Sequence, residues 1–99
     1  MGEKTAIKEE TRVKVTKPKM YKVYMHNDDY TTMEFVVEIL IGYFNKTPSE
    51  ATKIMLDVHK KGAGLAGIYP YDIAITKINQ VHSKARENGF PLKLSLKEE

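Results

Sequence analysis

The chain has 99 residues, no cysteine, and 16 lysine and arginine residues against 13 aspartate and glutamate residues. Its length suits one small domain with a single core and excludes a multi-domain enzyme. The lack of cysteine excludes disulfides, thiolate nucleophiles and cysteine-ligated zinc. No apolar run approaches the ~20 residues of a membrane span, and no apolar signal core starts the chain, so we expect a soluble, cytoplasmic protein without membrane contact.

The net charge of +3 belongs to the first nineteen residues. Residues 1–19 carry six basic and three acidic side chains, whereas residues 20–99 carry ten of each. Because a phosphate-binding surface needs an excess of positive charge, we expect no nucleic-acid partner. The first nineteen residues are also poor in large apolar side chains, which predicts a flexible basic arm at 1–19 and a folded domain at 20–99.

A strand and then a helix are predicted at the start of the domain. Residues 20–26 alternate in the period of a half-buried strand, and the polar run Asn27-Asp28-Asp29 ends it. Thr31 and Glu34 have the spacing of a capping box, which predicts the start of a helix there. The apolar residues that recur at helical spacing are Met33, Val36, Val37, Leu40, Ile41 and Phe44.

A second start signal, Thr47-Pro48-Ser49-Glu50, predicts a helix that runs to about Lys61. Gly62 suits its left-handed C-terminal cap. Residues 62–70 are too short and too rich in glycine for a helix, and they end in proline, so we expect a tight strand.

A third helix follows and ends at Gly89. Its apolar face consists of Tyr71, Ala74, Ile75, Ile78, Val81, His82 and Ala85. Leu92, Leu94 and Leu96 then alternate with polar residues as in a strand. The order β-α-α-β-α-β predicts an α+β domain in which three helices cover one face of a three-stranded antiparallel sheet.

Two clusters of side chains point to a binding site. The run from Asn27 through the first turn of the first helix can hold a small charged group beside an apolar pocket. On the second helix, Met55 and His59 are spaced i and i+4, beside the inward stripe of Ala51, Ile54 and Val58. A plainer interpretation stays open on these residues alone: His59 suits the negative end of a helix dipole, and adjacent aspartates often only solvate a turn.

Metal and hydrolytic chemistry are poorly supported by the sequence. His26, Asp28, Asp29 and His59 could supply ligands, but no metal-binding spacing such as His-Glu-x-x-His occurs, so we expect no metal and no cofactor. No Gly-x-Ser-x-Gly elbow or other activated nucleophile is visible. We therefore expect a binding protein rather than an enzyme.

Several motifs in consistent order resemble the ClpS adaptors of bacterial protein degradation. They are Met20-Tyr21-Lys22-Val23, Asn27-Asp28-Asp29-Tyr30-Thr31, Met33-Glu34-Phe35-Val36, Met55-Leu56-Asp57-Val58-His59, and Ala85-Arg86-Glu87-Asn88 before Pro91-Leu92. The resemblance covers roughly residues 19–96. It implies a monomeric, non-enzymatic adaptor that binds proteins or peptides with an N-terminal Leu, Phe, Tyr or Trp. It also implies delivery to the N-terminal domain of a Clp AAA+ unfoldase of the ClpA or ClpC type.

The resemblance also implies roles for individual residues. Asn27 and His59 would hydrogen-bond the α-ammonium of the cargo, and Asp28 would add a negative or water-mediated partner. The implied pocket for the cargo side chain consists of Thr31, Met33, Val36, Met55, Val58 and Leu92. The implied contacts with the unfoldase are Tyr30, Asp72 and Lys77.

One alternative of another class shares this order of elements. The C-terminal domain of the ribosomal stalk protein is also a small sheet with three helices, and it binds folded translation factors. Fold alone does not separate the two functions. The separating feature is the combination of Asn27-Asp28-Asp29 with Met55 and His59, which a stalk-like interaction module does not require.

Overall fold

The structure is a computed structural model that describes residues 17–99. The predicted arm at 1–19 therefore lies almost wholly outside the described residues. The elements in chain order are β1 (Met20–His26), α2 (Met33–Phe44), α3 (Pro48–Lys61), β2 (Ala63–Pro70), α4 (Tyr71–Glu87) and β3 (Lys93–Glu98). This order confirms the predicted one. Within residues 17–99 no helix has the length and apolar character needed to cross a membrane.

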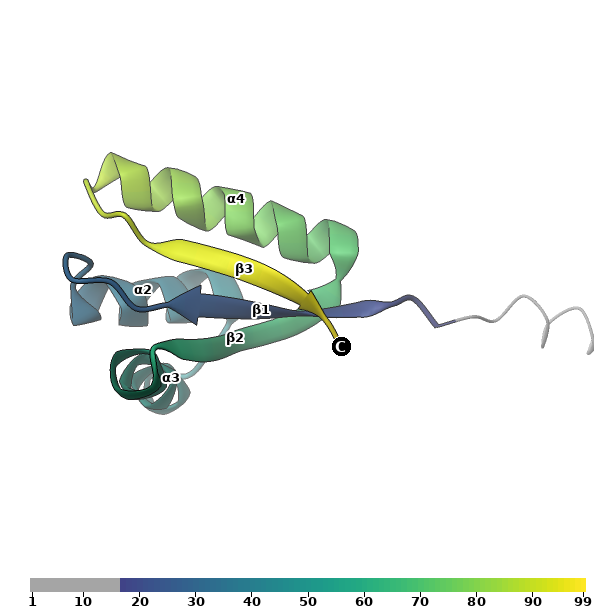
Figure 1. Ribbon diagram of the computed structural model, residues 1–99, viewed down its shortest axis with the longest axis horizontal. Coiled ribbons are helices and arrows are strands. Elements are labelled where there is room, and N and C mark those ends of the chain that lie inside the picture. The colour runs from purple at the N-terminus through teal and green to yellow at the C-terminus, as the bar shows by residue number, and fades with distance from the viewer. Residues whose placement is uncertain (1–16) are drawn as a thin grey trace, which may run out of the picture.

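The sheet has the strand order β2-β1-β3, and β1 is antiparallel to both neighbours. The predicted antiparallel sheet is thus confirmed. In Figure 1 the sheet lies in front of α2, with α4 above it and α3 below. The inward side chains of the central strand, Val23 and Met25, have no exposed surface, because the helices cover that face.

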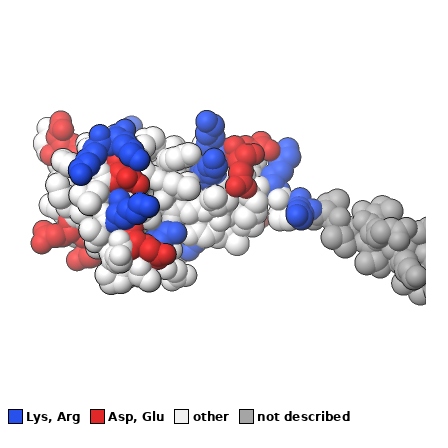
Figure 2. All heavy atoms as spheres, turned by 90° about the horizontal axis from the view of Figure 1, so that it is seen from below, with Lys and Arg blue, Asp and Glu red and all other residues white. Residues whose placement is uncertain are grey.

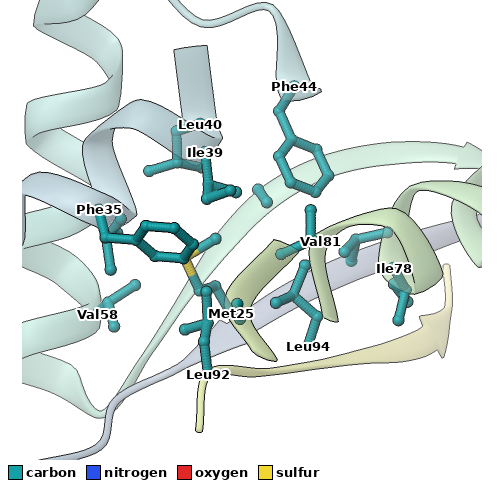
Figure 3. Packing of buried hydrophobic residues seen from close by; sticks show 14 of the residues in the cluster. Met25, Phe35, Ile39, Leu40, Phe44, Val58, Ile78, Val81, Leu92 and Leu94 are labelled. Carbon is teal, nitrogen blue, oxygen red and sulfur yellow. The ribbon is translucent and has the colours of Figure 1, made fainter. Parts of the chain in front are cut away.

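The core lies between the helices and the covered face of the sheet, and Figure 3 shows side chains from α2, α4 and the strands converging there. The buried residues with large side chains are Val23, Met25, Phe35, Val36, Ile39, Leu40, Phe44, Val58, Ile78, Val81, Leu92 and Leu94. The rings of Phe35 and Phe90 lie 4.9 Å apart between centroids, which ties the start of α2 to the segment that leads into β3.

The start of α2 differs from the prediction. The N-cap is Thr32, whose hydroxyl accepts a hydrogen bond from the Phe35 amide at 3.1 Å. Thr31 takes no part in the cap, because its hydroxyl donates to Asp28 instead. The predicted capping box of Thr31 and Glu34 is therefore absent: the N-cap lies one residue later, where the third helical residue is Phe35, and Thr31 belongs to the loop before the helix.

The buried face of α2 also differs from the predicted stripe. The residues that it buries are Phe35, Val36, Ile39, Leu40 and Phe44. Met33 and Ile41, which were expected on that face, are 48% and 38% exposed. The sequence of α2 is apolar on almost every side, so the helical period alone did not select the face that packs on the sheet.

Helix α3 confirms its predicted ends. Thr47 and Glu50 form the complete capping box, Pro48 is the first helical residue, and Gly62 caps the end in a left-handed conformation with φ of 90°. The left-handed conformation costs glycine little free energy, because glycine has no Cβ. The chain therefore reverses tightly from α3 into β2.

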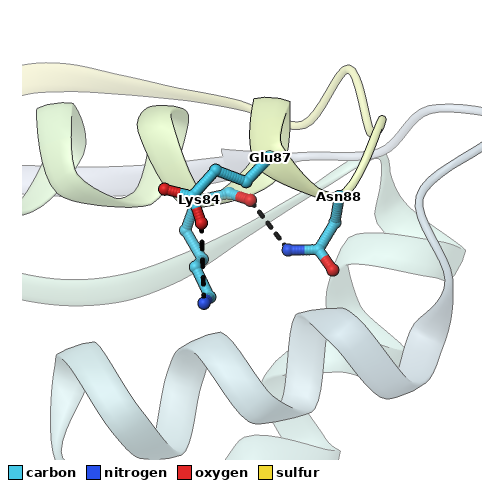
Figure 4. A network of polar contacts seen from close by, with 3 residues as sticks. All are labelled: Lys84, Glu87 and Asn88. Atoms are coloured by element: carbon cyan, nitrogen blue, oxygen red, sulfur yellow. Dashed lines mark hydrogen bonds and ion pairs between the residues drawn. The ribbon is translucent and has the colours of Figure 1, made fainter.

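Helix α4 begins directly after Pro70 and ends at Glu87, with Asn88 as its C-cap. Its end is closed by polar contacts, which Figure 4 shows: the Asn88 side-chain amide donates to the Lys84 carbonyl at 2.9 Å, and Lys84 and Glu87 form an ion pair of 3.8 Å. Tyr71, expected on the apolar face, is 51% exposed. Its ring meets Tyr21 edge-on at 5.3 Å instead.

A single imidazole joins α4 to the edge of the sheet. The Leu94 amide of β3 donates to Nε2 of His82 at 2.9 Å, so this nitrogen must carry no proton. Burial lowers the pKa of His82, and the positive charges of Arg86 and Lys93 lower it further. The structure therefore holds this histidine neutral.

We expect this contact to make stability depend on pH. Because the folded state has the lower pKa, the unfolded chain binds more protons once the pH falls below the ordinary histidine value of ~6.5. The free energy of unfolding should be constant above that pH and decrease as the pH falls below it. His82→Gln, which keeps an acceptor but does not titrate there, should flatten the curve. Urea unfolding at several pH values checks this, and an unchanged slope in the variant would contradict it.

Candidate functional site

A cavity of about 450 Å³ opens where β1 ends. Its walls come from the loop between β1 and α2, the first turns of α2, and the second half of α3. The lining residues are Asn27, Asp28, Asp29, Tyr30, Thr31, Thr32, Met33, Val36, Met55, Val58 and His59. Its volume falls within the range of ~300–1,000 Å³ that is usual for ligand pockets.

The loop and α3 are held together by the backbone. The Asn27 amide donates to the carbonyl of Gly62 at 3.0 Å, directly after His26 pairs with Ala63 in the sheet. Gly62 ends α3, and His59 lies in the last turn of the same helix. This hydrogen bond therefore brings Asn27 and His59, which are 32 positions apart in the sequence, to one cavity.

Gly64 allows α3 to lie close to the sheet. A Cβ at this position would stand 2.9 Å from Val58 Cγ2 and 3.0 Å from the Ile54 carbonyl oxygen. One of these atoms belongs to the backbone of α3, so a rotamer change cannot relieve the clash. Val58 lines the cavity, and the position of the cavity wall thus depends on this glycine.

Gly64→Ala should therefore destabilise the fold by about 1–3 kcal/mol, the usual range for overpacking a filled site. For a domain of this size, each kcal/mol corresponds to a decrease in Tm of roughly 4–8 °C. Gly42→Ala on the exposed side of α2 is the matched control, because a Cβ there meets nothing within 4 Å. Calorimetry of both variants checks this. Equal Tm values for the two would contradict the close approach.

Asp28 fixes the loop at the cavity rim. One carboxylate oxygen, Oδ1, accepts from the Tyr30 amide at 2.8 Å and from the Thr31 amide at 2.6 Å. The other, Oδ2, accepts from the Thr31 hydroxyl at 2.7 Å. Partial burial raises the pKa of Asp28, but these bonds from Thr31 and Tyr30 together outweigh it and bring the pKa below its usual value. Asp28 therefore holds the loop in place at the rim and carries a negative charge there.

The cavity combines an apolar interior with a polar rim. Val36 and Val58 are only 5% and 4% exposed and form the interior, beside the half-buried Met55. Met33 stands at the mouth with 48% of its surface exposed. The amide, carboxylate and imidazole groups of the rim are hydrogen-bond acceptors. Such a site can hold an apolar group next to a small group that donates hydrogen bonds.

The structure places most of the predicted binding residues around this one cavity. The three residues expected to bind an α-amine lie on its rim, and five of the six expected pocket residues line it. Leu92 does not: it is 4% exposed, belongs to the core, and lines a separate hollow with His82 and Phe90. Asp29 and Thr32 also line the cavity; both lie in the candidate run of the sequence, but neither was expected to have a role in binding the α-amine or the side chain.

The three expected contacts with a partner do not form one patch. Tyr30 is 75% exposed on the cavity rim, whereas Asp72 and Lys77 border a hollow of about 260 Å³ on α4. Lys77 is also engaged within the fold, because its ammonium donates to the Tyr43 carbonyl at 2.7 Å. That carbonyl lies at the end of α2, where the helix dipole favours a cation.

Charge does not gather into a patch of one sign on the described face that Figure 2 shows. On the face shown in Figure 2, lysines and arginines are interspersed with aspartates and glutamates. Among residues 17–99 there is no group of three or more His, Asp or Glu side chains that could hold a metal ion. The cavity at the end of β1 is therefore the site that the described part of the chain defines best.

Comparisons with known proteins identify the family of this chain. The family model described as ATP-dependent Clp protease adaptor protein ClpS matches residues 16–95. The adapter protein ClpS of Clostridium acetobutylicum is 67% identical over 85 residues, covering 86% of this chain and 84% of the relative. That of Acetivibrio thermocellus is 62% identical over 92 residues, covering 93% of each.

A solved structure has the same fold. Agrobacterium tumefaciens ClpS2 bound to L-phenylalaninamide matches with a TM-score of 0.80 at 35% identity, over 84% of this chain and all of the other. The family model covers well over half of the chain, and the alignments cover well over two thirds of both relatives. The chain thus belongs to the ClpS family of ATP-dependent Clp protease adaptors.

Proposed function

We propose that the cavity binds proteins by their N-terminus, and that the chain delivers them as a monomeric adaptor to a Clp AAA+ unfoldase and its peptidase. The free α-ammonium would sit on the polar rim, and the side chain of an N-terminal Leu, Phe, Tyr or Trp would enter the apolar interior. The observation that supports this most is that one cavity has both a polar rim and an apolar interior. ClpS2, a family member, was solved with a phenylalanine derivative bound.

The rim has the composition that an ammonium group requires. An ammonium carries three N–H donors and a positive charge, so it needs acceptors on several sides. Asn27 would supply an amide oxygen and His59 a ring nitrogen. Asp28 has both oxygens engaged with its own loop. It would therefore contribute its negative charge, and it would contact the ammonium through a bridging water or a remaining lone pair.

The interior has the composition that a large apolar side chain requires. Burying a Leu or Phe side chain contributes ~1.5–3 kcal/mol, and each hydrogen bond to a charged group contributes ~1.5–3 kcal/mol. One side chain and two or three such bonds give a gross total near ~10 kcal/mol, which association and ordering costs reduce. An affinity on the order of micromolar remains, and this suits an adaptor that must release its cargo.

Delivery needs a second surface. The hollow on α4 beside Asp72 and Lys77 is a candidate for the contact with the N-terminal domain of a ClpA- or ClpC-type unfoldase, with the 48% exposed Ile73 at its border. No step in this function makes or breaks a bond in the adaptor, so the chain would not act as an enzyme. The family assignment replaces the stalk-like interaction module as the account of this fold.

The test is degradation of a folded reporter with an N-terminal Leu by a Clp unfoldase and peptidase, with and without this chain. We expect faster degradation with the adaptor, and no acceleration for a reporter that begins with Ser. Asp72→Lys, on the surface away from the cavity, should reduce delivery while the Leu peptide still binds. Equal rates with and without the adaptor, across unfoldases of both types, would contradict the proposed delivery.

A further inference from the structure

Tyr30 is a large aromatic residue on the cavity rim. The proposed binding of the ammonium and of the first side chain gives this residue no role. It lines the cavity, yet 75% of its surface is exposed. The interior made by Val36, Met55 and Val58 can take one apolar side chain, and the polar rim can take the ammonium. An exposed aromatic ring beside both would remain free for a further group of the same ligand.

The backbone that carries this ring is fixed. The amides of Tyr30 and Thr31 both donate to Oδ1 of Asp28, at 2.8 and 2.6 Å, and the Thr31 hydroxyl binds Oδ2. The next residue, Thr32, is the N-cap of α2. Tyr30 is therefore held between a closed turn and the start of a helix, and only the two torsions of its side chain remain to be ordered on binding.

We propose that the ring of Tyr30 forms a second subsite, which contacts the side chain of the second residue of the cargo and favours an aromatic or large apolar one. This inference rests on the proposed function. Once the first side chain fills the interior and the ammonium is held on the rim, the peptide must leave the cavity across that rim. The second residue is then the first group to pass over the loop that carries Tyr30.

The chemistry of the ring determines which second residues gain. Aromatic side chains pair edge-to-face or offset with one another and also bury aliphatic groups well. Glycine at the second position offers nothing to such a ring. A contact of this kind predicts an affinity roughly three- to ten-fold higher for a peptide that begins Phe-Trp or Phe-Leu than for one that begins Phe-Gly.

The test contains no unfoldase, so a contact between Tyr30 and the unfoldase cannot affect its result. Isothermal titration uses the whole chain alone with three unlabelled ligands: peptides beginning Phe-Trp and Phe-Gly, and phenylalaninamide, which has no second residue. The measured quantity is the ratio of the Phe-Trp to the Phe-Gly affinity. Tyr30→Ala removes the ring, and Tyr30→Phe keeps the ring but removes the hydroxyl.

We expect a ratio of about three to ten in the unmodified chain and in Tyr30→Phe, and a ratio near one in Tyr30→Ala. An unchanged ratio in Tyr30→Ala would overturn the subsite. So would an equal loss of affinity for all three ligands, phenylalaninamide included, because that result indicates a disturbed loop. If the unmodified chain binds none of the ligands, the proposed function itself fails, which is a different result from either of these.

Discussion

Asn27→Ala is expected to weaken the binding of a peptide that begins with Phe or Leu by roughly 10- to 100-fold, and His59→Ala by a similar factor. Each variant removes one acceptor from the ammonium, and a hydrogen bond to a charged group contributes ~1.5–3 kcal/mol, with 1.4 kcal/mol corresponding to tenfold in affinity. Fluorescence anisotropy with a labelled peptide measures the change.

Matched controls exist for both variants. Asn79 is exposed on α4 in a separate hollow, and His26 bonds to Ser95 on the sheet and is not among the residues that line the cavity. Asn79→Ala and His26→Ala should bind as the unmodified chain does. Circular dichroism melts of all four variants identify any that lose the fold. Unchanged affinity in folded Asn27→Ala and His59→Ala would remove these residues from the site.

The second large effect concerns the mouth of the cavity. Met33 is the first residue of α2 and is 48% exposed there. A side chain branched at Cβ is widest close to the backbone, where it would meet Met33, whereas Leu and Phe are narrow at that point. We expect peptides that begin with Leu to bind much better than those that begin with Ile or Val. Met33→Ala should reduce this discrimination by about tenfold, the order expected for steric selection of one methyl group.

Met33→Leu is the control for the mouth, because it keeps a side chain of similar size and should keep the discrimination. The measurement is the ratio of Leu-peptide to Ile-peptide affinity in the three proteins. The ratio is the informative quantity, since a general loosening of the cavity would lower both affinities together. The same Leu-to-Ile ratio in Met33→Ala and the unmodified chain would show that Met33 is no gate.

The parts of the fold that the sequence predicted correctly are those with strong local signals. The box of Thr47 and Glu50 with Pro48 fixed the start of α3, because the three signals agree. At the start of α2, two adjacent threonines could each act as the cap, and only the competing bond from Thr31 to Asp28 decides for Thr32. That bond depends on the folded loop, which no local pattern describes.

The site was predictable in its motif and less so in its walls. Asn27 and His59 meet because the β1–β2 pairing and the carbonyl of Gly62 place the loop against α3. Alternation indicated correctly that Leu92 points inward. The pocket role expected for Leu92 came from the family resemblance instead, and in the structure its side chain belongs to the core and lines a separate hollow with Phe90. Which part of an interior a side chain reaches is decided by helix packing, not by period.

The central claim is that the cavity recognises a free α-ammonium together with an apolar side chain. The most direct measurement titrates one Phe-starting peptide in two forms, with its N-terminus free and with it acetylated, into the full chain. Acetylation removes the charge and two donors but leaves the phenylalanine side chain. We predict saturable binding of the free form and a loss of at least about 100-fold on acetylation, because two or three charge-assisted bonds disappear. Equal binding of the two forms would contradict the account.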